Sequence, residues 1–487
     1  MQLIFEKSKK GRRAFSFPKL DVPVSSLLPE KYCRKKEVFL PEVSELDVVR
    51  HFTNLAQLNF CVDTNFYPLG SCTMKYNPKF TEAIANLPGF LELNPFLPQL
   101  PSGESLSQGA LEVLYETERL LCEITGMDAF TLQPLAGAHG ELTGALIIAA
   151  YHKDKGAKKT HIIIPDSAHG TNPASAAIAG FEVVVIPTDK EGYLDMASYQ
   201  KALNPKTAAV MLTCPDTLGL FNPRIKEITD LAHKVGALMY YDGANLNAIL
   251  GRCKMKDLGF DIVHLNLHKT FATPHGGGGP GAGPVGVVER LVDYLPISRV
   301  KRRPDGTYFL DYEKRKTIGY IAPFYGNFAV ILKAYAYILA LGKEGLLAVS
   351  ENAVLNANYC LSKLKEYYNV AFDKRCMHEF VLSCEKQLEF GVCALDIAKY
   401  LIDHGFHPPT VYFPLIVKEA LMIEPTETEN KETLDKFISV MIEAAKLSKT
   451  SPEKIKNTPL KTAVQRPDEV QAARKPNLRW YPEDENL

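Results

Sequence analysis

Lys269 and Asp242 are the two residues whose types and order give this chain its most specific chemistry. The lysine stands in His-Lys-Thr-Phe, and the aspartate stands upstream in Asp-Gly-Ala-Asn. A lysine amine can form a Schiff base with the aldehyde of pyridoxal phosphate, and a carboxylate can keep the pyridine nitrogen of that cofactor protonated. The pair therefore predicts a pyridoxal phosphate enzyme. A tight Asp-Gly turn and a solvated lysine are the alternative explanation.

The sequence around the pair favours the catalytic explanation. Residues 208–213 form an apolar run typical of a buried strand, residues 225–235 repeat apolar side chains at helical spacing, and residues 237–241 form a second apolar run. A strand, a crossover helix and a strand predict two parallel strands, with Asp242 at the carboxyl end of the second. A third apolar run brings Lys269 to the same edge, where ligands of open parallel sheets bind.

A loop of small residues upstream could hold the phosphate of the cofactor. Gly137, Ala138 and His139 lie in Gln-Pro-Leu-Ala-Gly-Ala-His-Gly-Glu, directly before an apolar helical stretch. Small residues let backbone amides close on an anion at a helix N-terminus. The pattern is common by itself, and its position upstream of Asp242 and Lys269 is what favours a phosphate-binding loop.

A metal site is not expected. His264 and His268 have the spacing of a metal-binding pair on a helix, but this segment is typical of a strand followed by a loop. The two side chains would then not share a face, and no cysteine or carboxylate at usable spacing completes a ligand set. Cys72 is expected to be a wall residue, because the sequence assigns it no basic partner.

Composition excludes several functional classes. The chain has 487 residues, of which 46% are hydrophobic and 23% charged, so it can bury a large core. A formal net charge of zero gives no reason to expect nucleic acid or a membrane as partner. Ten cysteines without close pairs are typical of free thiols in a reducing compartment, which predicts a cytoplasmic protein. No stretch is long and apolar enough to span a bilayer.

Longer motifs show a family resemblance over nearly the whole chain. It resembles the P-proteins of the glycine cleavage system, and among them the subunit 2 chains of two-subunit glycine dehydrogenases (decarboxylating). The motifs that carry the resemblance lie in residues 63–78, 133–141, 165–173, 217–221, 242–245, 268–271 and 424–429. The fold that this implies is α/β, namely a fold-type-I, aminotransferase-like transferase dependent on pyridoxal phosphate. It would have a large, mostly parallel sheet domain and a smaller C-terminal α/β domain.

The resemblance also implies roles for individual residues. Lys269 would be the Schiff-base lysine, Asp242 the partner of the ring nitrogen, and His169 a catalytic imidazole stacked on the ring face. His169, His268 and Lys75 would also help electrostatically. The remaining cofactor-binding residues would be Gly137, Ala138, His139, Thr217, Asn245 and His268.

The activity that the resemblance implies is that of a pyridoxal-phosphate-dependent oxidoreductase. It decarboxylates glycine, releases carbon dioxide, and transfers the remaining aminomethyl group to the lipoyl arm of the H-protein. The assembly would be a heterotetramer of two subunits 1 and two subunits 2. An aminotransferase or a cysteine-desulfurase-like lyase would use the same lysine and aspartate and is the alternative. A non-catalytic scaffold is a third possibility, against which the presence of both residues argues.

The sequence predicts four parts. Residues 1–60 would be an N-terminal arm with entry helices, and the arm either packs on a neighbouring subunit or is a disordered basic tail. Residues 61–330 would be the large cofactor-binding domain, and residues 331–450 the small C-terminal α/β domain. Residues 451–487 contain prolines throughout and would be an extended C-terminal tail.

Overall fold

The computed structural model describes residues 2–23, 28–36, 38–100, 102–313 and 315–480. The chain forms two compact units. Met1–Cys61 and Asn457–Leu487 make up the smaller one, and Val62–Lys456 make up the larger one. All of the residues to which the sequence assigns chemistry belong to the larger unit.

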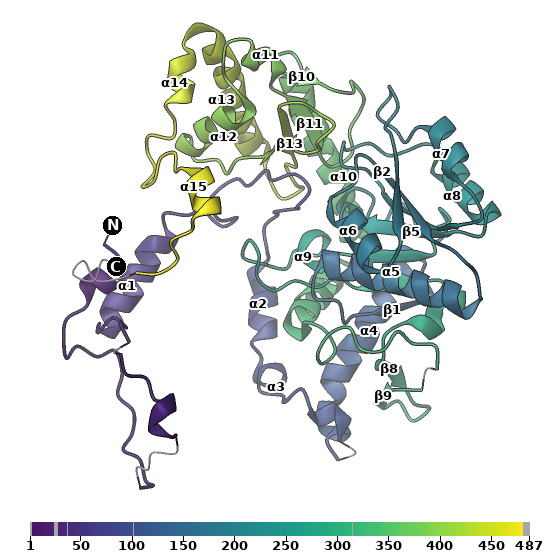
Figure 1. The fold of residues 1–487 in the computed structure, drawn as a ribbon, viewed down its shortest axis with the longest axis horizontal. Helices are drawn as coiled ribbons and strands as arrows, with labels where there is room; N and C mark the ends of the chain where they lie inside the picture. The colour runs from purple at the N-terminus through teal and green to yellow at the C-terminus, as the bar shows by residue number, and fades with distance from the viewer. Residues whose placement is uncertain (1, 24–27, 37, 101, 314, 481–487) are drawn as a thin grey trace. The chain divides into compact units, whose positions relative to one another are not determined.

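The larger unit is built on a seven-stranded sheet with the strand order β1-β7-β6-β5-β4-β2-β3 (Figure 1). Strands β3, β2, β4, β5 and β6 run parallel to one another, and β7 runs antiparallel to both of its neighbours, β6 and β1. The strands are β1 Ala129–Thr131, β2 His161–Pro165, β3 Glu182–Ile186, β4 Thr207–Thr213, β5 Leu238–Gly243, β6 Ile262–Leu265 and β7 Val285–Val287. A mostly parallel sheet is therefore observed, as predicted.

Helices cover both faces of this sheet, and the alternation of side chains along the strands explains why. In β5, Tyr240 packs in the apolar cluster with α5 and α6, whereas Met239 and Tyr241 pack in the cluster with α4, α8 and α10. Successive side chains of a strand point to opposite faces, so a strand buried on both faces is apolar throughout. The helices of this layer arrangement are α4 Gln108–Thr125, α5 Gly137–Asp154, α6 Thr171–Ile178, α7 Met196–Ala202, α8 Ile225–Lys234 and α9 Leu267–Thr270.

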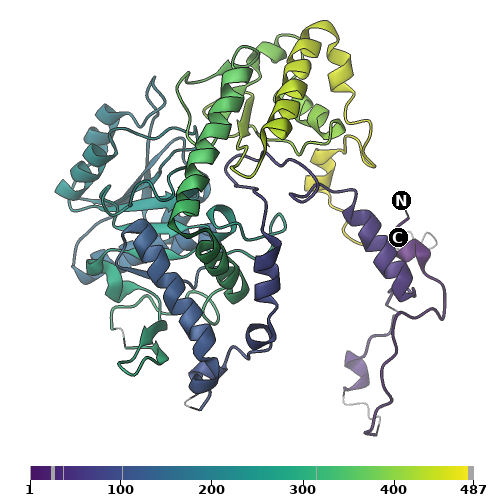
Figure 2. The same ribbon diagram turned by 180° about the vertical axis from the view of Figure 1, so that it is seen from behind.

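A second sheet is antiparallel and has the order β10-β11-β13-β12. Its strands are β10 Asn369–Val370, β11 Phe380–Ser383, β12 Thr410–Val411 and β13 Ala420–Ile423, and its helices include α11 Glu385–Leu388, α12 Ala394–Asp403, α13 Lys431–Thr450 and α14 Pro452–Lys456. The long helix α10, Phe328–Leu364, connects the two sheets and kinks at Gly342 (Figure 2). This helix packs against α4 at one end and α13 at the other.

Shorter elements complete the larger unit. They are α2 Lys79–Ala85, α3 Pro88–Leu91 and the hairpin of β8 Arg299–Arg302 with β9 Tyr308–Asp311. The segment before α2 reaches the second sheet, because Leu69 forms a β-bridge with Ile423 and the amide of Gly70 donates to the carbonyl of Met422. Residues 69–75 are thereby fixed beside β13.

The smaller unit contains α1 Glu45–Ala56 and α15 Glu469–Arg474. Ser44 and Asp47 form a capping box at the start of α1, which satisfies two backbone amides. Phe5 and Trp480 stack with their ring centroids 4.9 Å apart, so an early and a late segment of the chain pack together in this unit. Residues 481–487 lie outside the described part of the chain.

The prediction that residues 451–487 form an extended tail is wrong for two short segments, which are helical. Helices α14 and α15 lie within residues 451–480, although prolines suggested extended chain throughout. Pro452 is the first residue of α14, where its missing N–H costs nothing, and Asp468 caps α15 by accepting from the amide of Gln471.

Among the described residues, no helix has the length and apolar character needed to cross a membrane.

Candidate active site

Asp242 lies near the carboxyl end of β5 and is almost completely buried. Its Oδ2 accepts a hydrogen bond from Asn172 Nδ2 over 3.0 Å, and its Oδ1 accepts one from the amide of Ala244 over 3.0 Å. Burial alone would raise the pKa of this carboxyl, but His264, the two hydrogen bonds and Lys269 outweigh it, so the pKa is lowered. Asp242 is therefore an ionised carboxylate at neutral pH, as a partner of a protonated ring nitrogen must be.

His264 and Glu141 surround this carboxylate. Nε2 of His264 lies 3.4 Å from Asp242 Oδ1, while its Nδ1 lies 2.6 Å from the hydroxyl of Tyr240. Burial lowers the pKa of His264, so the ring is neutral at pH 7. Burial and the nearby Asp242 raise the pKa of Glu141 to about 8, so Glu141 carries a proton at pH 7. One negative charge therefore remains in the group, and it belongs to Asp242.

Lys269 lies in α9, directly after β6, and its amine donates to the carbonyl oxygen of Ser71 over 2.7 Å. β6 pairs with β5 in parallel, with Asp242 opposite His264. The lysine and the aspartate therefore lie at the same edge of the sheet, as the order of strands and helix predicted. The contact with Ser71 joins two segments that are far apart in the sequence.

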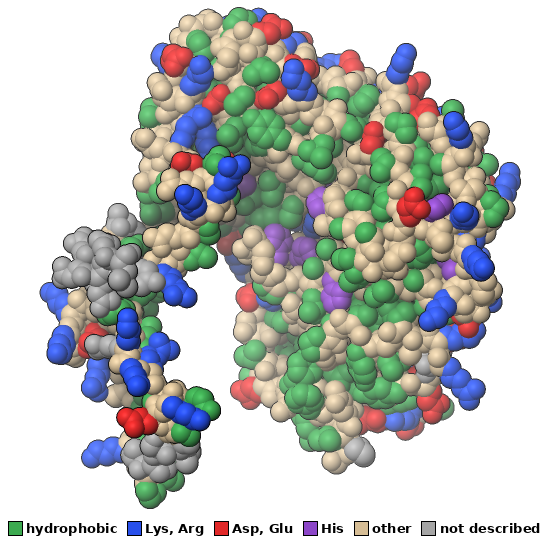
Figure 3. All heavy atoms as spheres, in the orientation of Figure 1, with side chains coloured by type: hydrophobic (Ala, Val, Ile, Leu, Met, Phe, Trp, Pro, Cys, Tyr) green, Lys and Arg blue, Asp and Glu red, His purple; other side chains and the backbone are tan. Residues whose placement is uncertain are grey.

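Two further histidines lie beside Lys269. The rings of His268 and His275 meet edge to face at 5.4 Å, and Nδ1 of His268 accepts from the amide of Ala282. Burial and the positive charge of Lys269 lower the pKa of His268 to about 3, so this predicted cofactor-binding residue is neutral. Histidine side chains gather within one hollow on the face drawn in Figure 3.

Cys72 has a basic neighbour that the sequence did not reveal. Its Sγ lies 3.6 Å from Nε2 of His275. Burial nevertheless raises the pKa of the Cys72 thiol, which keeps it protonated. The side chain thus forms part of the wall rather than a thiolate nucleophile.

The predicted phosphate loop begins helix α5, with Gly137 as the first helical residue. The first amides of an α-helix have no intrahelical acceptor, so those of Gly137, Ala138 and His139 can bind an anion. A Cβ atom on Gly137 would lie 2.5 Å from Asn266 Oδ1, and one on Gly140 would lie 2.8 Å from the carbonyl oxygen of Gly283. The loop therefore packs closely against the segment that carries Lys269.

The other predicted residues lie at the ends of neighbouring elements. His169, before α6, is exposed, and its Nδ1 interacts with the hydroxyl of Thr171 at 2.8 Å. The hydroxyl of Thr217 donates to the carbonyl oxygen of Ser167. Asn245 is buried and donates to the carbonyl oxygens of two residues, Pro215 and Asp216, and to Glu379 Oε1. Their roles toward the cofactor stay predictions.

Pyridoxal phosphate fits this edge of the sheet, because several buried polar atoms there have no hydrogen-bond partner among the described residues. They are Glu141 Oε2, Asn172 Oδ1, Thr213 Oγ1, His264 Nε2, Asn266 Oδ1 and Thr270 Oγ1. A buried polar atom without a partner costs free energy, so such a concentration at one place is typical of a binding site. A polar ring with a phosphate would supply partners of the required kind.

Three residues of this site could have been suspected only in part from the sequence. Asn172 and Glu141 lie in segments that carry the family resemblance, but nothing local shows that they face Asp242. The sequence also gave His264 no carboxylate neighbour, whereas Glu141, Asp242 and His264 have ligand atoms within 4.8 Å of one another. The absence of a metal remains an expectation of the sequence.

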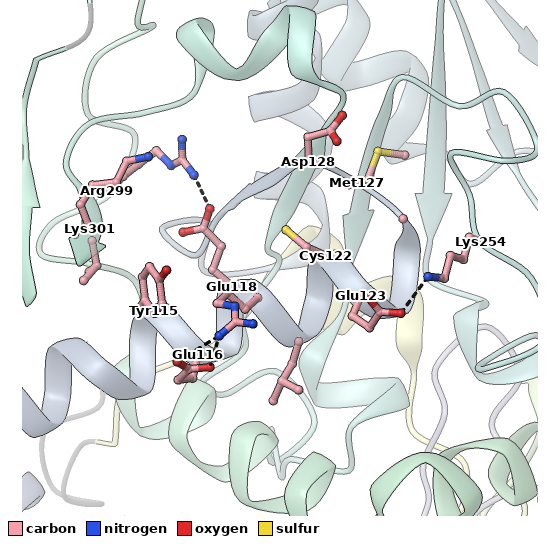
Figure 4. A pocket seen from close by; sticks show the side chains of 14 residues that line it. Tyr115, Glu116, Glu118, Cys122, Glu123, Met127, Asp128, Lys254, Arg299 and Lys301 are labelled. Atoms are coloured by element: carbon pink, nitrogen blue, oxygen red, sulfur yellow. Dashed lines mark hydrogen bonds and ion pairs between the residues drawn. The ribbon is translucent and has the colours of Figure 1, made fainter. Parts of the chain in front are cut away.

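A separate pocket of about 620 Å³ lies along α4 (Figure 4). Six of its charged side chains form three ion pairs: Arg299 with Glu118, Lys254 with Glu123, and Arg119 with Glu116. None of the residues that line it belongs to the group around Asp242 and Lys269. The pocket therefore adds nothing to the proposed chemistry.

Comparison with known proteins gives the same family and the same fold class that the sequence motifs predicted. A family model described as glycine dehydrogenase, C-terminal domain, matches residues 349–464, and one described as aminotransferase class-V matches residues 140–278. The probable glycine dehydrogenase (decarboxylating) subunit 2 of Caldanaerobacter subterraneus subsp. tengcongensis is 60% identical, with 98% of each chain covered. The protein of the same name from Desulforamulus reducens is 55% identical, with 99% of each chain covered.

Solved structures of low sequence identity share the fold. A crystal structure of glycine decarboxylase (P-protein) of the glycine cleavage system, in inhibitor-bound form, has a TM-score of 0.71 at 21% identity and covers 86% of this chain and 93% of its own. A cysteine desulfurase from Thermococcus onnurineus has a TM-score of 0.61 at 16% identity, covering 79% and 95%. The fold is thus that of the fold-type-I pyridoxal phosphate enzymes, and the chain belongs to the family of glycine dehydrogenase (decarboxylating) subunit 2 proteins.

Proposed function

We propose that this chain is the cofactor-bearing subunit of a glycine dehydrogenase (decarboxylating) in the glycine cleavage system. It would decarboxylate glycine, release carbon dioxide, and transfer the aminomethyl group to the lipoyl arm of the H-protein. The observation that carries the proposal is the pairing of an ionised, buried Asp242 with Lys269 at one sheet edge in a chain 60% identical to a subunit 2 protein. A subunit with only a scaffold role would need neither a buried, ionised aspartate nor a lysine at this edge of the sheet.

The chemistry requires an electron sink. Pyridoxal phosphate, when bound, supplies one for the electron pair that stays on the α-carbon of glycine when carbon dioxide leaves. Asp242 would hold a proton at the ring nitrogen, and the hydrogen bonds from Asn172 and Ala244 keep its carboxylate oriented for this. Lys269 would bind the cofactor through its amine.

The other residues would orient the cofactor and limit charge around it. The amides of Gly137, Ala138 and His139 would bind the phosphate at the N-terminus of α5. The proton that Glu141 retains at pH 7 avoids a second negative charge beside Asp242. The further cofactor contacts that we propose are His169, Thr217, Asn245 and His268.

Residues 61–330 would form the cofactor-binding domain, and residues 331–450 the smaller C-terminal domain.

The partners that we propose are a subunit 1, with which the chain would form a heterotetramer, and a lipoylated H-protein. Support for a subunit contact comes from the smaller unit, which exposes large apolar side chains. Phe15 and Phe17 are 68% and 83% exposed, and Leu46, Val49 and Phe52 on α1 are each more than half exposed. Apolar groups of this size on one unit are typical of a protein interface. We expect the assembly to work in the cytoplasm.

An aminotransferase remains the alternative that an experiment must separate from this proposal. The purified full-length chain is mixed with pyridoxal phosphate, a subunit 1 and a lipoylated H-protein, and exchange of labelled carbon dioxide into the carboxylate of glycine is measured. Exchange that requires all three proteins and is lost in Lys269→Ala would support the proposal. Amino transfer between amino acids and keto acids without any carbon dioxide exchange would show that the alternative is right.

A further inference from the structure

The backbone of Ser71 lies between Lys269 and a buried glutamate. Its carbonyl oxygen accepts from Lys269 Nζ over 2.7 Å, and its N–H donates to Glu379 Oε2 over 2.8 Å. Glu379 directly precedes β11 in the second sheet, whereas Lys269 follows β6 in the first. The two peptide groups that flank the Cα atom of Ser71 therefore link the lysine of one sheet to a carboxylate of the other.

The Ser71 backbone needs this carboxylate. Its φ is +63°, in the left-handed region that residues with a Cβ seldom adopt. A hydrogen bond from an N–H to a carboxylate is among the stronger ones in proteins, so it can hold such a conformation. If the bond were lost, the φ and ψ angles of Ser71 could change, and the carbonyl oxygen would no longer face the lysine amine.

Glu379 is half of a buried carboxylate pair. It is fully buried, Glu424 is 1% exposed, and oxygen atoms of the two lie within 4.8 Å of each other and of His378. Nε2 of His378 is 4.0 Å from an oxygen of each glutamate, which is too long for a hydrogen bond, and neither ring nitrogen has a partner among the described residues. Among the described residues, no lysine or arginine forms an ion pair with Glu379 or Glu424. Two buried carboxylates this close do not both ionise at neutral pH, so one of them retains a proton.

Hydrogen bonds decide which glutamate keeps that proton. Glu379 accepts from the Ser71 N–H and from Asn245 Nδ2, whereas Glu424 accepts only from Thr73 Oγ1, over 2.6 Å. Burial raises the pKa of Glu379 to about 7 and raises the pKa of Glu424 well above its usual value, and burial lowers that of His378 to about 3. Near neutral pH the proton therefore belongs to Glu424. The other ionisable groups around the pair are Lys269, Lys75, Glu427, Asp216 and Cys72.

We propose that Glu379 is a positioning residue for Lys269: it holds the backbone of Ser71 so that the Ser71 carbonyl oxygen faces the lysine amine, and the neutral Glu424 leaves Glu379 free to ionise. The inference rests on the proposed role of Lys269 in binding pyridoxal phosphate. Among the described residues, Glu379 has no hydrogen bond to Lys269, and Asn245 is the predicted cofactor residue that it does bond to. Glu379 acts on the lysine through the backbone of Ser71 and through the attraction between their charges.

Two measurements on the purified full-length chain test this. The first is the rate at which the visible absorbance of lysine-bound cofactor appears after pyridoxal phosphate is added. The second is the extent to which Lys269 of the cofactor-free chain is methylated by formaldehyde and a reductant, read by peptide mass spectrometry. Glu379→Ala should slow cofactor capture on the order of 10-fold and increase methylation, because the amine loses its acceptor. Glu379→Gln, which keeps an acceptor oxygen, should restore most of the rate.

The pH profile separates positioning from a general loss of structure. The ratio of the wild-type rate to the Glu379→Gln rate should rise as the pH rises through about 7, where Glu379 ionises. In a Glu424→Gln background the same rise should occur at about the same pH, because Glu424 is already protonated, and so uncharged, where Glu379 ionises. Glu419→Ala is the matched control: Glu419 also accepts a backbone N–H, from Ala394 over 2.6 Å, but it lies beside β13 and α12. It should change neither measurement.

A wild-type rate and methylation level in Glu379→Ala would overturn the inference, and so would a ratio that is the same at every pH. A chain that binds no cofactor through Lys269, but whose methylation responds to Glu379→Ala as described, would overturn the proposed function and support the positioning role. If Glu379→Ala does not fold, the comparison of Glu379→Gln with wild type across the pH range decides the question by itself.

Discussion

Asn172 donates a hydrogen bond to Asp242 over 3.0 Å, and this bond joins the first turn of α6 to the carboxyl end of β5. Asn172 is 1% exposed, so the bond is shielded from water. Together with the Ala244 amide it gives the Asp242 carboxylate one donor on each oxygen. The direction in which the carboxylate points is therefore set by two different segments of the chain.

Asn172→Ala should weaken cofactor binding. The substitution removes a donor to a charged, buried acceptor, a loss of about 1.5–3 kcal/mol, and it should raise the pKa of Asp242. An absorbance titration with pyridoxal phosphate measures the dissociation constant. Asn358→Ala is the control, because Asn358 donates to the carbonyl oxygen of Cys376 over 2.7 Å, away from the site. Equal affinities in the two variants would mean that Asn172 does not orient Asp242 for the cofactor.

Glu141→Gln should change how stability depends on pH. The pKa of Glu141 is raised to about 8 in the folded chain, against about 4.5 when unfolded, so its proton stabilises the folded state below pH 4.5 and that stability is lost as the pH rises to about 8. Glutamine cannot ionise, so the variant should gain melting temperature relative to wild type between pH 5 and about 8. Thermal unfolding of both cofactor-free chains across this range is the measurement. A constant difference would contradict the assigned protonation.

Gly137→Ala should disturb the loop that we propose for the phosphate. The added Cβ would meet Asn266 Oδ1 at 2.5 Å, so the loop or Asn266 must move, at a cost of about 1–3 kcal/mol. The expected result is a weaker affinity for pyridoxal phosphate, measured by absorbance titration. Gly109→Ala in α4 provides the control, since nothing lies within 4 Å of its added Cβ. Unchanged affinity in Gly137→Ala would show that this loop does not bind the phosphate of the cofactor closely.

Lys75→Ala should destabilise the fold strongly. Lys75 is 2% exposed and its amine bonds to Glu427 Oε1 over 2.6 Å and to Asn247 Oδ1 over 2.8 Å. Removing one member of a buried ion pair leaves the other charge unpaired and costs about 3–5 kcal/mol. Urea unfolding should show this loss. The double variant Lys75→Met with Glu427→Gln should recover much of it, and a double variant as unstable as the single one would show that packing is what the lysine supplies.

Much of the sheet that carries the site was predictable from local patterns. The runs at residues 208–213, 225–235 and 237–241 correspond to β4, α8 and β5, and the crossover between parallel strands has one preferred hand. These features depend on side-chain periodicity within a few residues of one another. For the same reason the sequence placed Asp242 and Lys269 at one edge, because each lies at or just beyond the carboxyl end of a strand of the same sheet.

Tertiary structure alone decided what surrounds those two residues. Ser71 and Glu379 are 308 positions apart, and Asn172 and Asp242 are 70 apart, so no local spacing signals either contact. The same is true of the carboxylate pair, because Glu379 precedes β11 and Glu424 follows β13. It is also true of the charge states of Glu141 and His264. Local periodicity fixes the elements and the edge at which they end. Which distant side chains become buried together, and therefore which of them keep a proton, depends on how the whole core packs.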